Sequence, residues 1–342
     1  MQSLASIAVV GAGSWGTALA KHLAGAGHRV CLWAYEPEVA RAIAQEHVNP
    51  LYLPGVELPP SLEATAELPQ ALAGAELVVM VVPSHVFRGV ISQVAEAIAP
   101  GATVVSCTKG IEADTGYTMC EVAEDVLPKE YHRRLCCLSG PSFAREVAAG
   151  VPTAVTVASR SPQAARMVQV VFSTDRFRVY TSPDLVGVEL GGAVKNPLAI
   201  AAGMCAGLEL GHNTLAALIT RGLAEMTRLS LARGGQLATL SGLAGLGDLV
   251  LTCTGELSRN RTVGYRLGKG ENIEQITASM QMVAEGVINT RTVLALARQA
   301  GVEMPITQAV YQVIYQDKPP LDALQELMTR QLKPEHDHNP DS

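Results

Sequence analysis

A short apolar run that leads into three closely spaced glycines constrains this chain most strongly. Residues 6–10 read SIAVV, and they are followed by GAGSWG and then by the helical pattern TALAKHLAGAG. The order strand, glycine turn, helix is the context in which this motif binds a dinucleotide, because the turn lets a pyrophosphate approach the backbone. The start of the helix adds free N–H donors. The sequence therefore predicts cofactor contacts at Gly11, Gly13 and Gly16.

Apolar runs and helix-like segments alternate up to about residue 183. The runs lie at 29–34, 76–82, 102–107, 135–139, 153–158 and 177–181, and helical patterns such as 84–98 and 162–172 lie between most of them. Strands that are apolar throughout are typical of a parallel sheet with helices on both faces. The predicted fold class is α/β, with an N-terminal Rossmann-type, mostly parallel sheet in a dinucleotide-binding domain of residues 1–183.

Residues 184–333 are predicted to form an all-α C-terminal domain for substrate and catalysis. In 213–229 the apolar residues share one helical face, Asn213 and Thr214 are cap candidates, and Arg221, Glu225 and Arg228 share a polar face. Further helices are expected at 273–284, 290–300 and 305–316. Residues 334–342, with His336 and His338, are predicted to form a solvated polar tail rather than a metal site.

Composition excludes several classes of function. A net charge of −6, 4% aromatic residues and no long basic run argue against nucleic-acid binding. The seven cysteines are odd in number and form no CxxC motif, which favours reduced thiols in the cytoplasm and no metal site. No apolar run reaches the roughly 18 residues of a membrane span, and no basic region precedes the first strand, so neither membrane insertion nor a signal peptide is expected.

Two residues at the end of the second apolar run are candidates for the adenosine end of a dinucleotide. Glu36 lies 20 residues beyond Gly16, where an acidic side chain would accept a hydrogen bond from a ribose hydroxyl. Tyr35 is the alternative: it could face the adenosine, with Glu36 turned to solvent. The sequence leaves the choice between NADH and NADPH open.

Polar residues also follow two of the later strands, where open sheets bind their ligands. Lys109 lies in CTKGIE, and Gly140 and Ser142 lie in SGPSFAREV. The alternatives are an exposed loop lysine and a serine that only caps a helix.

The helical part contains three further candidates. The stretch SGLAGLGDL at 241–249 is interpreted as a glycine-rich loop that ends at Asp248. Ser258, Arg259, Asn260 and Arg261 give two guanidinium groups, an amide and a hydroxyl that could hold a phosphate, or simply a polar helix start. Lys195 lies in the apolar run ELGGAVKNPLAIAAGM, where it either extends to water or is needed for chemistry.

Taken together, these segments resemble the NAD(P)-dependent glycerol-3-phosphate dehydrogenases of the soluble bacterial type, from about residue 6 to about residue 316. The resemblance rests on GAGSWGTALA, VVPSHVF, TKGIE, SGPSFAREVAAG, GGAVKN, ITRGLAEM, AGLGDLVLTCT, SRNR, AEGVINT and MPIT. It implies reversible reduction of dihydroxyacetone phosphate to sn-glycerol 3-phosphate with NADH or NADPH, as a step toward glycerophospholipids. It also implies a homodimer.

The resemblance assigns roles to residues at matching positions. Cofactor contacts are implied at Ser14, Trp15, Tyr35, Lys109, Ala144, Arg259, Val283 and Glu285, in addition to the three glycines and Glu36. Substrate contacts are implied at Lys109, Gly140, Ser142, Lys195, Asp248, Ser258, Arg259 and Asn260. Lys195 is the implied proton donor and acceptor, for which a pKa near 7 would be useful. Pro197 departs from the family pattern, and a local kink is expected there.

Two alternatives remain at this point. A 3-hydroxyacid or 6-phosphogluconate-type dehydrogenase would also place a lysine–asparagine pair on a helix, although SRNR and AGLGDL argue against it. A non-catalytic nicotinamide-binding sensor would keep the glycine turn, but it would not need Lys195, Asp248 and Arg259 together.

Overall fold

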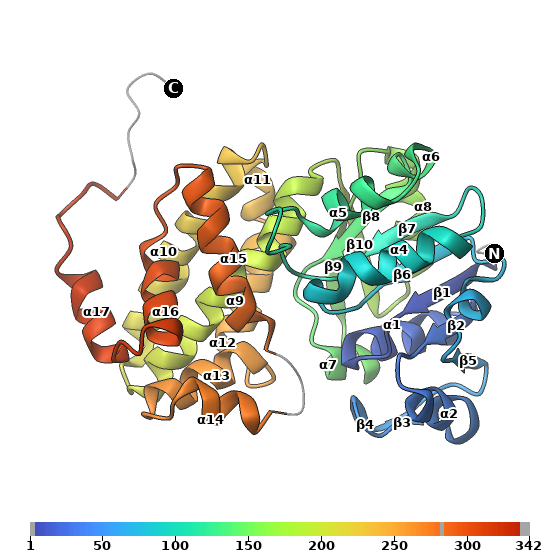
Figure 1. Cartoon of the computed structure of the whole chain (residues 1–342), viewed down its shortest axis with the longest axis horizontal. Helices are drawn as coiled ribbons and strands as arrows, with labels where there is room; N and C mark the ends of the chain where they lie inside the picture. Colours follow the sequence, from blue (N-terminus) through green and yellow to red (C-terminus); the bar gives the residue numbers. More distant parts are fainter. Residues whose placement is uncertain (1–3, 281–283, 336–342) are drawn as a thin grey trace.

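An eight-stranded sheet forms the frame of the N-terminal half. The computed structural model describes residues 4–280 and 284–335, and Figure 1 shows the sheet half and a helical half side by side. The strand order is β10-β9-β8-β7-β6-β1-β2-β5, and every neighbouring pair is parallel except β8 and β9. The strands are β1 Ser6–Val10, β2 Arg29–Trp33, β5 Leu62–Thr65, β6 Leu77–Met80, β7 Thr103–Ser106, β8 Leu135–Ser139, β9 Thr153–Ala158 and β10 Phe177–Ser182.

The strand order itself locates a ligand crevice. From β5 through β2 and β1 to β6, β7 and β8 it is the order of a dinucleotide-binding sheet, and the direction of winding reverses between β1 and β6. Ligands of such sheets bind beyond the carboxyl ends of the strands at this reversal. The loops after β1, β6, β7 and β8 therefore define the place to look for chemistry.

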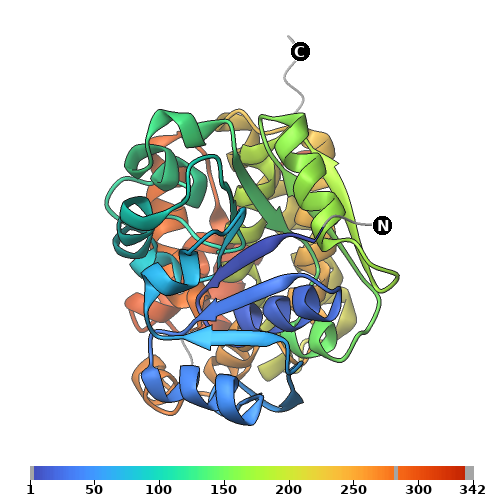
Figure 2. The ribbon, with the colours of Figure 1, turned by 90° about the vertical axis from the view of Figure 1, so that its right-hand side faces the viewer.

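Both faces of the sheet are buried under helices, as the apolar runs predict. In β1, Ile7 and Val9 belong to one core cluster and Ala8 and Val10 to another. Figure 2 shows the blue strands β5, β2 and β1 one above another, with helices on both sides of them. The helices and short strands of this half are α1 Ser14–Gly25, α2 Pro37–Glu46, β3 Val48–Asn49, β4 Leu53–Glu57, α3 Leu68–Leu72, η1 Ser84–Val86, α4 Phe87–Ala97, α5 Met119–Val126, α6 Lys129–His132, α7 Ala144–Ala148 and α8 Pro162–Phe172.

The predicted α/β class is confirmed, but three strands were not predicted. The sequence missed β3, β4 and β5, which are short and contain polar or glycine residues. The antiparallel direction of β9 also could not be predicted, because an apolar run does not reveal the direction of its neighbours.

One buried helix organises the C-terminal half. The helix α9 (Leu185–Gly207) runs through the core of this half and continues past Pro197, so proline does not end it. The helix α13 (Arg259–Gly268) approaches it at backbone distance: a Cβ on Gly264 would lie 1.9 Å from the Ile200 carbonyl oxygen. The other elements are α10 Gly211–Ala232, α11 Leu237–Leu240, η2 Leu243–Gly247, α12 Asp248–Thr254, α14 Ile273–Ala278, α15 Glu285–Gln299, α16 Pro305–Tyr315 and α17 Pro320–Met328.

Four sequence predictions about this half are wrong. The helix α10 begins at Gly211, so Asn213 and Thr214 lie inside it and do not cap it, and Glu225 is buried rather than part of a polar face. Residues 243–247 form one π-helical turn that leads into α12, not a loop. Its Gly245 is needed for packing, because a Cβ there would lie 2.1 Å from the Leu240 carbonyl oxygen. The helix expected at 273–284 ends as α14 at Ala278.

The predicted domain boundary at residues 183 and 184 stays a prediction; β10 ends at Ser182 and α9 begins at Leu185. The tail predicted at 334–342 lies outside the described residues from 336 onward.

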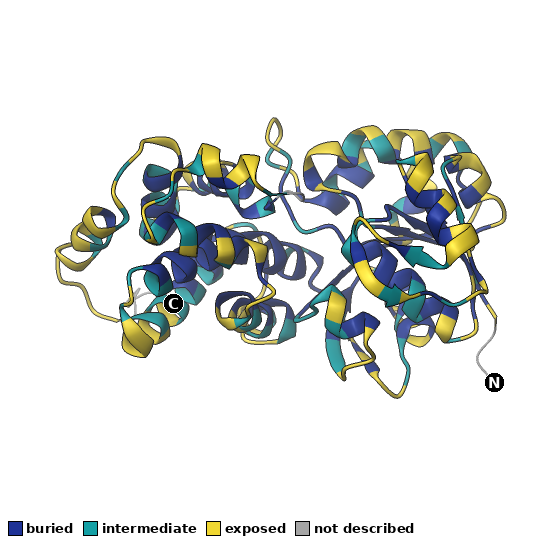
Figure 3. Cartoon of the chain, turned by 90° about the horizontal axis from the view of Figure 1, so that it is seen from below, coloured by how far each residue is buried: buried dark blue, intermediate teal, exposed yellow. Residues whose placement is uncertain are grey.

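Two segments are long and apolar enough to cross a membrane by length and composition alone. They are Leu185–Gly207, which is α9, and Leu237–Thr254, which spans α11, η2 and α12. The window in α9 is 94% buried inside the molecule, and Figure 3 shows buried helices in dark blue at the centre of the helical half. Burial in a protein core accounts for its apolar sequence.

Candidate active site

The glycine turn after β1 presents bare backbone toward open space. A Cβ on Gly16 would lie 1.8 Å from the Gly11 carbonyl oxygen, so these two glycines close the turn onto the helix. A Cβ on Gly13 would meet nothing within 4 Å. Gly13 is also the N-cap residue of α1 and provides no side chain to cap the first turn. Close packing on one side and an uncovered helix N-terminus on the other fit a dinucleotide pyrophosphate.

Four side chains from three distant segments meet beyond the ends of β7 and β8. The Lys195 ammonium donates to Asp248 Oδ1 at 2.5 Å and to Thr252 Oγ1 at 2.7 Å. The Lys109 ammonium donates to Asp248 Oδ2 at 2.6 Å and to the Gly140 carbonyl oxygen at 3.1 Å. One carboxylate thus joins two lysines, with each oxygen accepting from one ammonium.

Both Lys195 and Asp248 are buried, and burial changes how Lys195 titrates. Desolvation, the largest effect, lowers the pKa of Lys195 to about 8. The Asp248 carboxylate opposes that shift, and the neighbouring Lys109 ammonium adds to it. The site therefore contains an amine that can hold or release a proton close to neutral pH.

Small residues on α9 explain how Lys109 reaches this point. A Cβ on Gly192 would lie 3.3 Å from Lys109 Cγ and 2.8 Å from Ser139 Oγ, so the lysine stem crosses α9 over a glycine. The sequence around Lys195 is rich in small residues because α9 is crossed closely by neighbouring chain segments. The hypothesis of a merely exposed Lys109 is not supported by these contacts.

The turn after β8 brings Gly140 and Ser142 to the same region. Gly140 has a φ of +146°, and a Cβ there would lie 2.9 Å from Val155 Cα, so the position accepts only glycine without strain. Ser142 does not cap α7; its hydroxyl donates to the Gly140 carbonyl oxygen at 3.0 Å. Ser142 thereby braces the carbonyl that also accepts from Lys109.

The SRNR segment forms the start of α13, and its residues have different contacts. Ser258 is the N-cap, since its hydroxyl accepts from the Arg261 N–H at 3.2 Å. The Asn260 amide donates to Asn196 Oδ1 at 3.0 Å and accepts from the Gly286 N–H at 2.9 Å. The Arg259 guanidinium makes no hydrogen bond or ion pair within the described ranges.

Arg259 is accessible to solvent yet has protein around it. Desolvation lowers the pKa of its guanidinium, and the charge of Glu285 opposes this effect. A charged fork without protein partners is suited to an external anion.

Glu285, at the start of α15, lies against the loop that follows β6. Its two carboxylate oxygens accept from the Ser84 N–H at 3.2 Å and from the Ser84 hydroxyl at 2.7 Å. Val283, the other cofactor residue predicted in this segment, lies outside the described residues.

The predicted adenosine residues lie at the other end of the crevice. Tyr35 is 79% exposed and packs edge-on against Trp33, with ring centroids 6.4 Å apart. Glu36 is half-buried and accepts from the Tyr52 hydroxyl at 2.7 Å, while the Ser14 hydroxyl donates to the Tyr52 carbonyl oxygen at 2.5 Å. Tyr52 therefore connects the glycine turn to Glu36.

Trp15 and Ala144 pack in one apolar cluster with Leu53 and Ala148, beside the first turn of α1. They form an apolar wall next to the glycine turn.

Sequence reasoning missed Thr252 and Tyr52. Thr252 lies four residues after Asp248 in DLVLTCT, so one helical turn places it on the same face, and this spacing could have identified it. Tyr52 lies between two strands that were not predicted, and no pattern in the sequence pointed to it.

Comparison with known proteins gives one consistent result. Residues 6–165 match the family model for the N-terminus of NAD-dependent glycerol-3-phosphate dehydrogenase, and residues 184–325 match the model for its C-terminus. The glycerol-3-phosphate dehydrogenase (NAD(P)+) of Geobacter sulfurreducens is 56% identical over 96% of this chain and 98% of its own length. The counterpart from Koribacter versatilis is 55% identical with the same coverage.

Solved structures agree with these relatives. The crystal structure of glycerol-3-phosphate dehydrogenase from Coxiella burnetii superposes with a TM-score of 0.91 at 43% identity, and it covers 96% of this chain and 99% of that one. A ketopantoate reductase from Ralstonia eutropha is only 16% identical with a TM-score of 0.58, which is a likeness of fold alone.

Proposed function

The chain belongs to the NAD-dependent glycerol-3-phosphate dehydrogenase family, and from this premise we propose how its own residues carry out the reaction. It is an oxidoreductase that reduces dihydroxyacetone phosphate reversibly to sn-glycerol 3-phosphate with NADH or NADPH. Lys195 is the proton donor in the direction of reduction and the acceptor in the direction of oxidation. The observation that carries this role is the buried Asp248 carboxylate shared by Lys195 and Lys109.

The count of hydrogen-bond donors supports this role. An ammonium group has three N–H donors, and among the described residues Lys195 uses two of them, on Asp248 and Thr252. Lys109 also uses two, on Asp248 and the Gly140 carbonyl. One N–H of each lysine is left for the oxygens of a substrate, and Asp248 keeps the two ammonium groups near one another.

The bound nicotinamide supplies the hydride, and the protein manages the charge that results. Negative charge grows on the ketone oxygen during reduction, and an ammonium in a water-poor site stabilises it and then protonates it. With a pKa of about 8, Lys195 is largely protonated at neutral pH and can still release its proton. In the reverse direction the neutral amine takes the proton of the hydroxyl group.

The phosphate and the cofactor are held by the residues around this centre. Arg259 binds the phosphate with its unpaired fork, helped by Asn260 and the start of α13 at Ser258. The turn at Gly11, Gly13 and Gly16 holds the pyrophosphate, with Ser14, Trp15 and Ala144 beside it. Tyr35 and Glu36 line the adenosine end, and Glu285 lies next to Arg259.

The direct test of this function is cofactor oxidation with dihydroxyacetone phosphate as substrate. We expect turnover with dihydroxyacetone phosphate. We expect little cofactor reduction when a 3-hydroxyacid or 6-phosphogluconate is offered in the direction of oxidation. Turnover only with the latter compounds would contradict the substrate assignment, and cofactor binding without any turnover would indicate a sensor.

Arg259→Ala tests the phosphate contact within this assay. A charge-assisted hydrogen bond contributes about 1.5–3 kcal/mol, so kcat/KM for dihydroxyacetone phosphate should fall by about 10–150-fold. Unphosphorylated dihydroxyacetone, a much poorer substrate, should be affected far less. Equal losses for both compounds would mean that Arg259 supports the fold or the cofactor instead.

We also propose that the protein is a homodimer that associates through the helical half. A groove of about 910 Å³ lies between α10, α16, α17 and residues 330–334. Apolar side chains that line the groove are exposed to solvent: Met328 is 76% exposed and Leu332 is 96% exposed. The rim carries both signs of charge, for example Arg330 and Lys333 with Glu303, as self-complementary contacts between two copies require.

Light scattering after size-exclusion chromatography tests the dimer. Wild type is expected at the mass of two chains, and the double variant Met328→Asp, Leu332→Asp at the mass of one. A monomeric wild type, or a variant that stays dimeric, would contradict this interface.

We further propose that the enzyme acts in the cytoplasm and that its product, sn-glycerol 3-phosphate, is used for phospholipid synthesis. All seven cysteines are unpaired, and five of them are buried, which suits a reducing compartment.

A further inference from the structure

The helix α15 places two polar side chains, one helical turn apart, against the loops of the sheet half that frame the site. Glu285 binds Ser84 in the loop after β6 through the Ser84 N–H and hydroxyl. Asn289 is fully buried, and its amide donates to the Lys109 carbonyl oxygen in the loop after β7, at 3.4 Å. Residues i and i+4 share one face of a helix, so a single face of α15 holds both loops.

The two loops also contact one another directly. A Cβ on Gly110 would lie 2.4 Å from Ser84 Cβ and 3.4 Å from Asn289 Oδ1. Ser84 therefore rests on the Cα of Gly110, which is the residue after Lys109. The loop after β6 cannot shift toward β7 without moving the backbone that carries Lys109.

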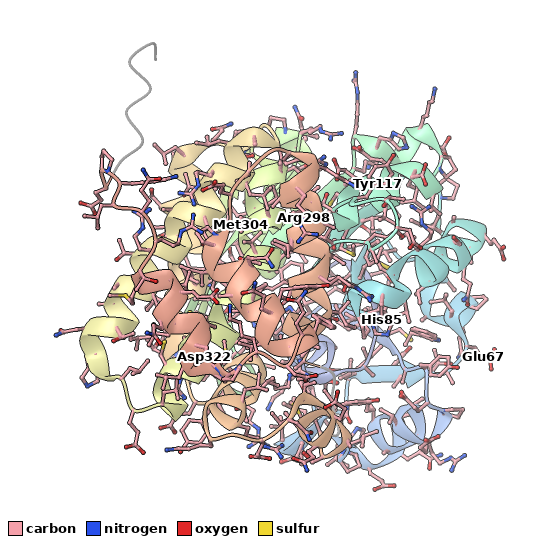
Figure 4. The ribbon with its side chains drawn as sticks, turned by 60° about the vertical axis from the view of Figure 1, so that its left-hand side comes forward. Glu67, His85, Tyr117, Arg298, Met304 and Asp322 are labelled. Atoms are coloured by element: carbon pink, nitrogen blue, oxygen red, sulfur yellow. The ribbon has the colours of Figure 1, made fainter. Side chains whose placement is uncertain are left out.

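The contact between α15 and the sheet half continues along the helix. A Cβ on Gly116 would lie 3.4 Å from Leu296 and from Gln299 of α15. In Figure 4, His85 marks the loop after β6, Tyr117 marks the segment that follows Lys109, and Arg298 marks the far end of α15. The helix thus contacts both loops, and it also packs against α9.

We propose that Ser84 and Asn289 are positioning residues, which fix the Lys109–Gly110 turn against α15 so that the Lys109 ammonium reaches Asp248. The base of Lys109 is held by Asn289 and Ser84, and its tip is held by Asp248 and Gly140. Neither positioning residue touches Lys195 or Asp248 in the described contacts. Their effect on the reaction would pass through Lys109.

The charged groups that face Lys195 give a readout for this arrangement. Asp248 raises the pKa of Lys195, and Lys109 lowers it. If the Lys109–Gly110 turn loosens and the Lys109 ammonium moves away, it lowers the pKa of Lys195 less. Asp248 then interacts with Lys195 alone. Both changes raise the pKa of Lys195, so the pH limit of activity should move upward.

The test compares Ser84→Ala, Asn289→Ala and the double variant with wild type, and uses Ser92→Ala as the matched control. Ser92 is an exposed serine of α4 whose hydroxyl donates to the Arg88 carbonyl oxygen, away from this contact. Each single variant should lose about tenfold in kcat/KM for dihydroxyacetone phosphate, as expected for loss of one hydrogen bond to a charged or backbone acceptor. The double variant should lose less than the product of the two, because both residues act on one turn. The pH limit of the reaction should rise in all three.

A merely structural role would lower the unfolding temperature and leave the pH limit where it is in wild type. That result, or wild-type kinetics in Ser84→Ala, would overturn the proposal. Ser84→Ala removes only a hydroxyl, so it keeps the test valid if Asn289→Ala does not fold. The inference rests on the proposed function: an inactive wild type would count against the function, whereas an active wild type with unaffected variants would count against these two residues.

Discussion

Two carboxylates in the helical half, Asp248 and Glu225, are each only 1% exposed. Different groups offset the cost of burying them: ammonium groups at Asp248, and N–H and hydroxyl donors at Glu225. Asp248 is paired with two ammonium groups. Glu225 has no such partner in the described residues: it accepts from the Ile306 N–H at 2.6 Å and from the N–H and hydroxyl of Thr307 at 3.2 and 3.0 Å. One carboxylate joins three separate segments, and the other caps the start of α16.

The difference shows how equal burial leads to different roles. Burial raises the pKa of Glu225 to about 7, although the N–H groups of α16 counteract the effect. At Asp248 the neighbours are ammonium groups, and its charge raises the pKa of Lys195 against the lowering by burial and by Lys109. A carboxylate held by backbone groups serves the fold, whereas one held by lysines with unused N–H donors can serve a reaction.

Of the substitutions in this comparison, replacing Lys195, which contacts Asp248, should reduce turnover most. Lys195→Met keeps the length and apolar stem of the side chain but removes the proton, so kcat should fall by about 10²–10⁴-fold. Cofactor binding, measured by fluorescence titration, should stay close to wild type. Near-normal turnover in a folded variant would contradict the proposed role of Lys195 in proton transfer, and with it the role of Asp248.

Glu36 extends the comparison to a carboxylate near the surface. If it accepts from the ribose 2′-hydroxyl of NADH, the 2′-phosphate of NADPH would meet a like charge, at a cost on the order of 1 kcal/mol or more. Glu36→Ser should then shift the ratio of kcat/KM values toward NADPH by roughly tenfold. An unchanged ratio would mean that Glu36, held by Tyr52, does not face the cofactor.

Changing Glu225 should alter stability and leave the reaction rate as it is. A carboxyl group whose folded pKa is raised stabilises the fold fully below its ordinary value of 4.5, and that contribution is lost as the pH rises through about 7. The free energy of unfolding in urea should therefore fall less between pH 4.5 and 7 in Glu225→Gln than in wild type. Glu189, whose pKa is also raised to about 7 by burial, adds the same slope to both proteins. A loss of kcat/KM in this variant would contradict the division of roles.

The sequence predicted the position of the glycine turn between β1 and α1, because a tight strand–helix turn depends on local geometry. Gly11, Gly13 and Gly16 lie within six residues, and their strand–turn–helix context is visible in the chain itself. The same holds for the apolar strands, whose burial on both faces leaves a continuous pattern.

The sequence was less informative where contacts join distant segments. Nothing near Glu225 in the chain marks it as buried, because its partners lie 81 and 82 residues away. The grouping of Lys109, Lys195 and Asp248 came only from a family resemblance, since 53 and 139 residues separate these partners. The π-helical turn before Asp248 was taken for a loop because its glycines serve close packing, which only the folded neighbours reveal.

The central claim is that the Asp248 charge raises the pKa of Lys195, and the pH dependence of kcat/KM in wild type and in Asp248→Asn tests it most directly. The proposed role requires Lys195 to be protonated in the direction of reduction, so wild-type activity should be present at low pH and be lost as the pH rises through about 8. Asn keeps the shape of the side chain and removes the charge that raises the pKa of Lys195, so the variant should lose activity at a lower pH. The same pH limit in both proteins, or a higher one in Asp248→Asn, would contradict the claim.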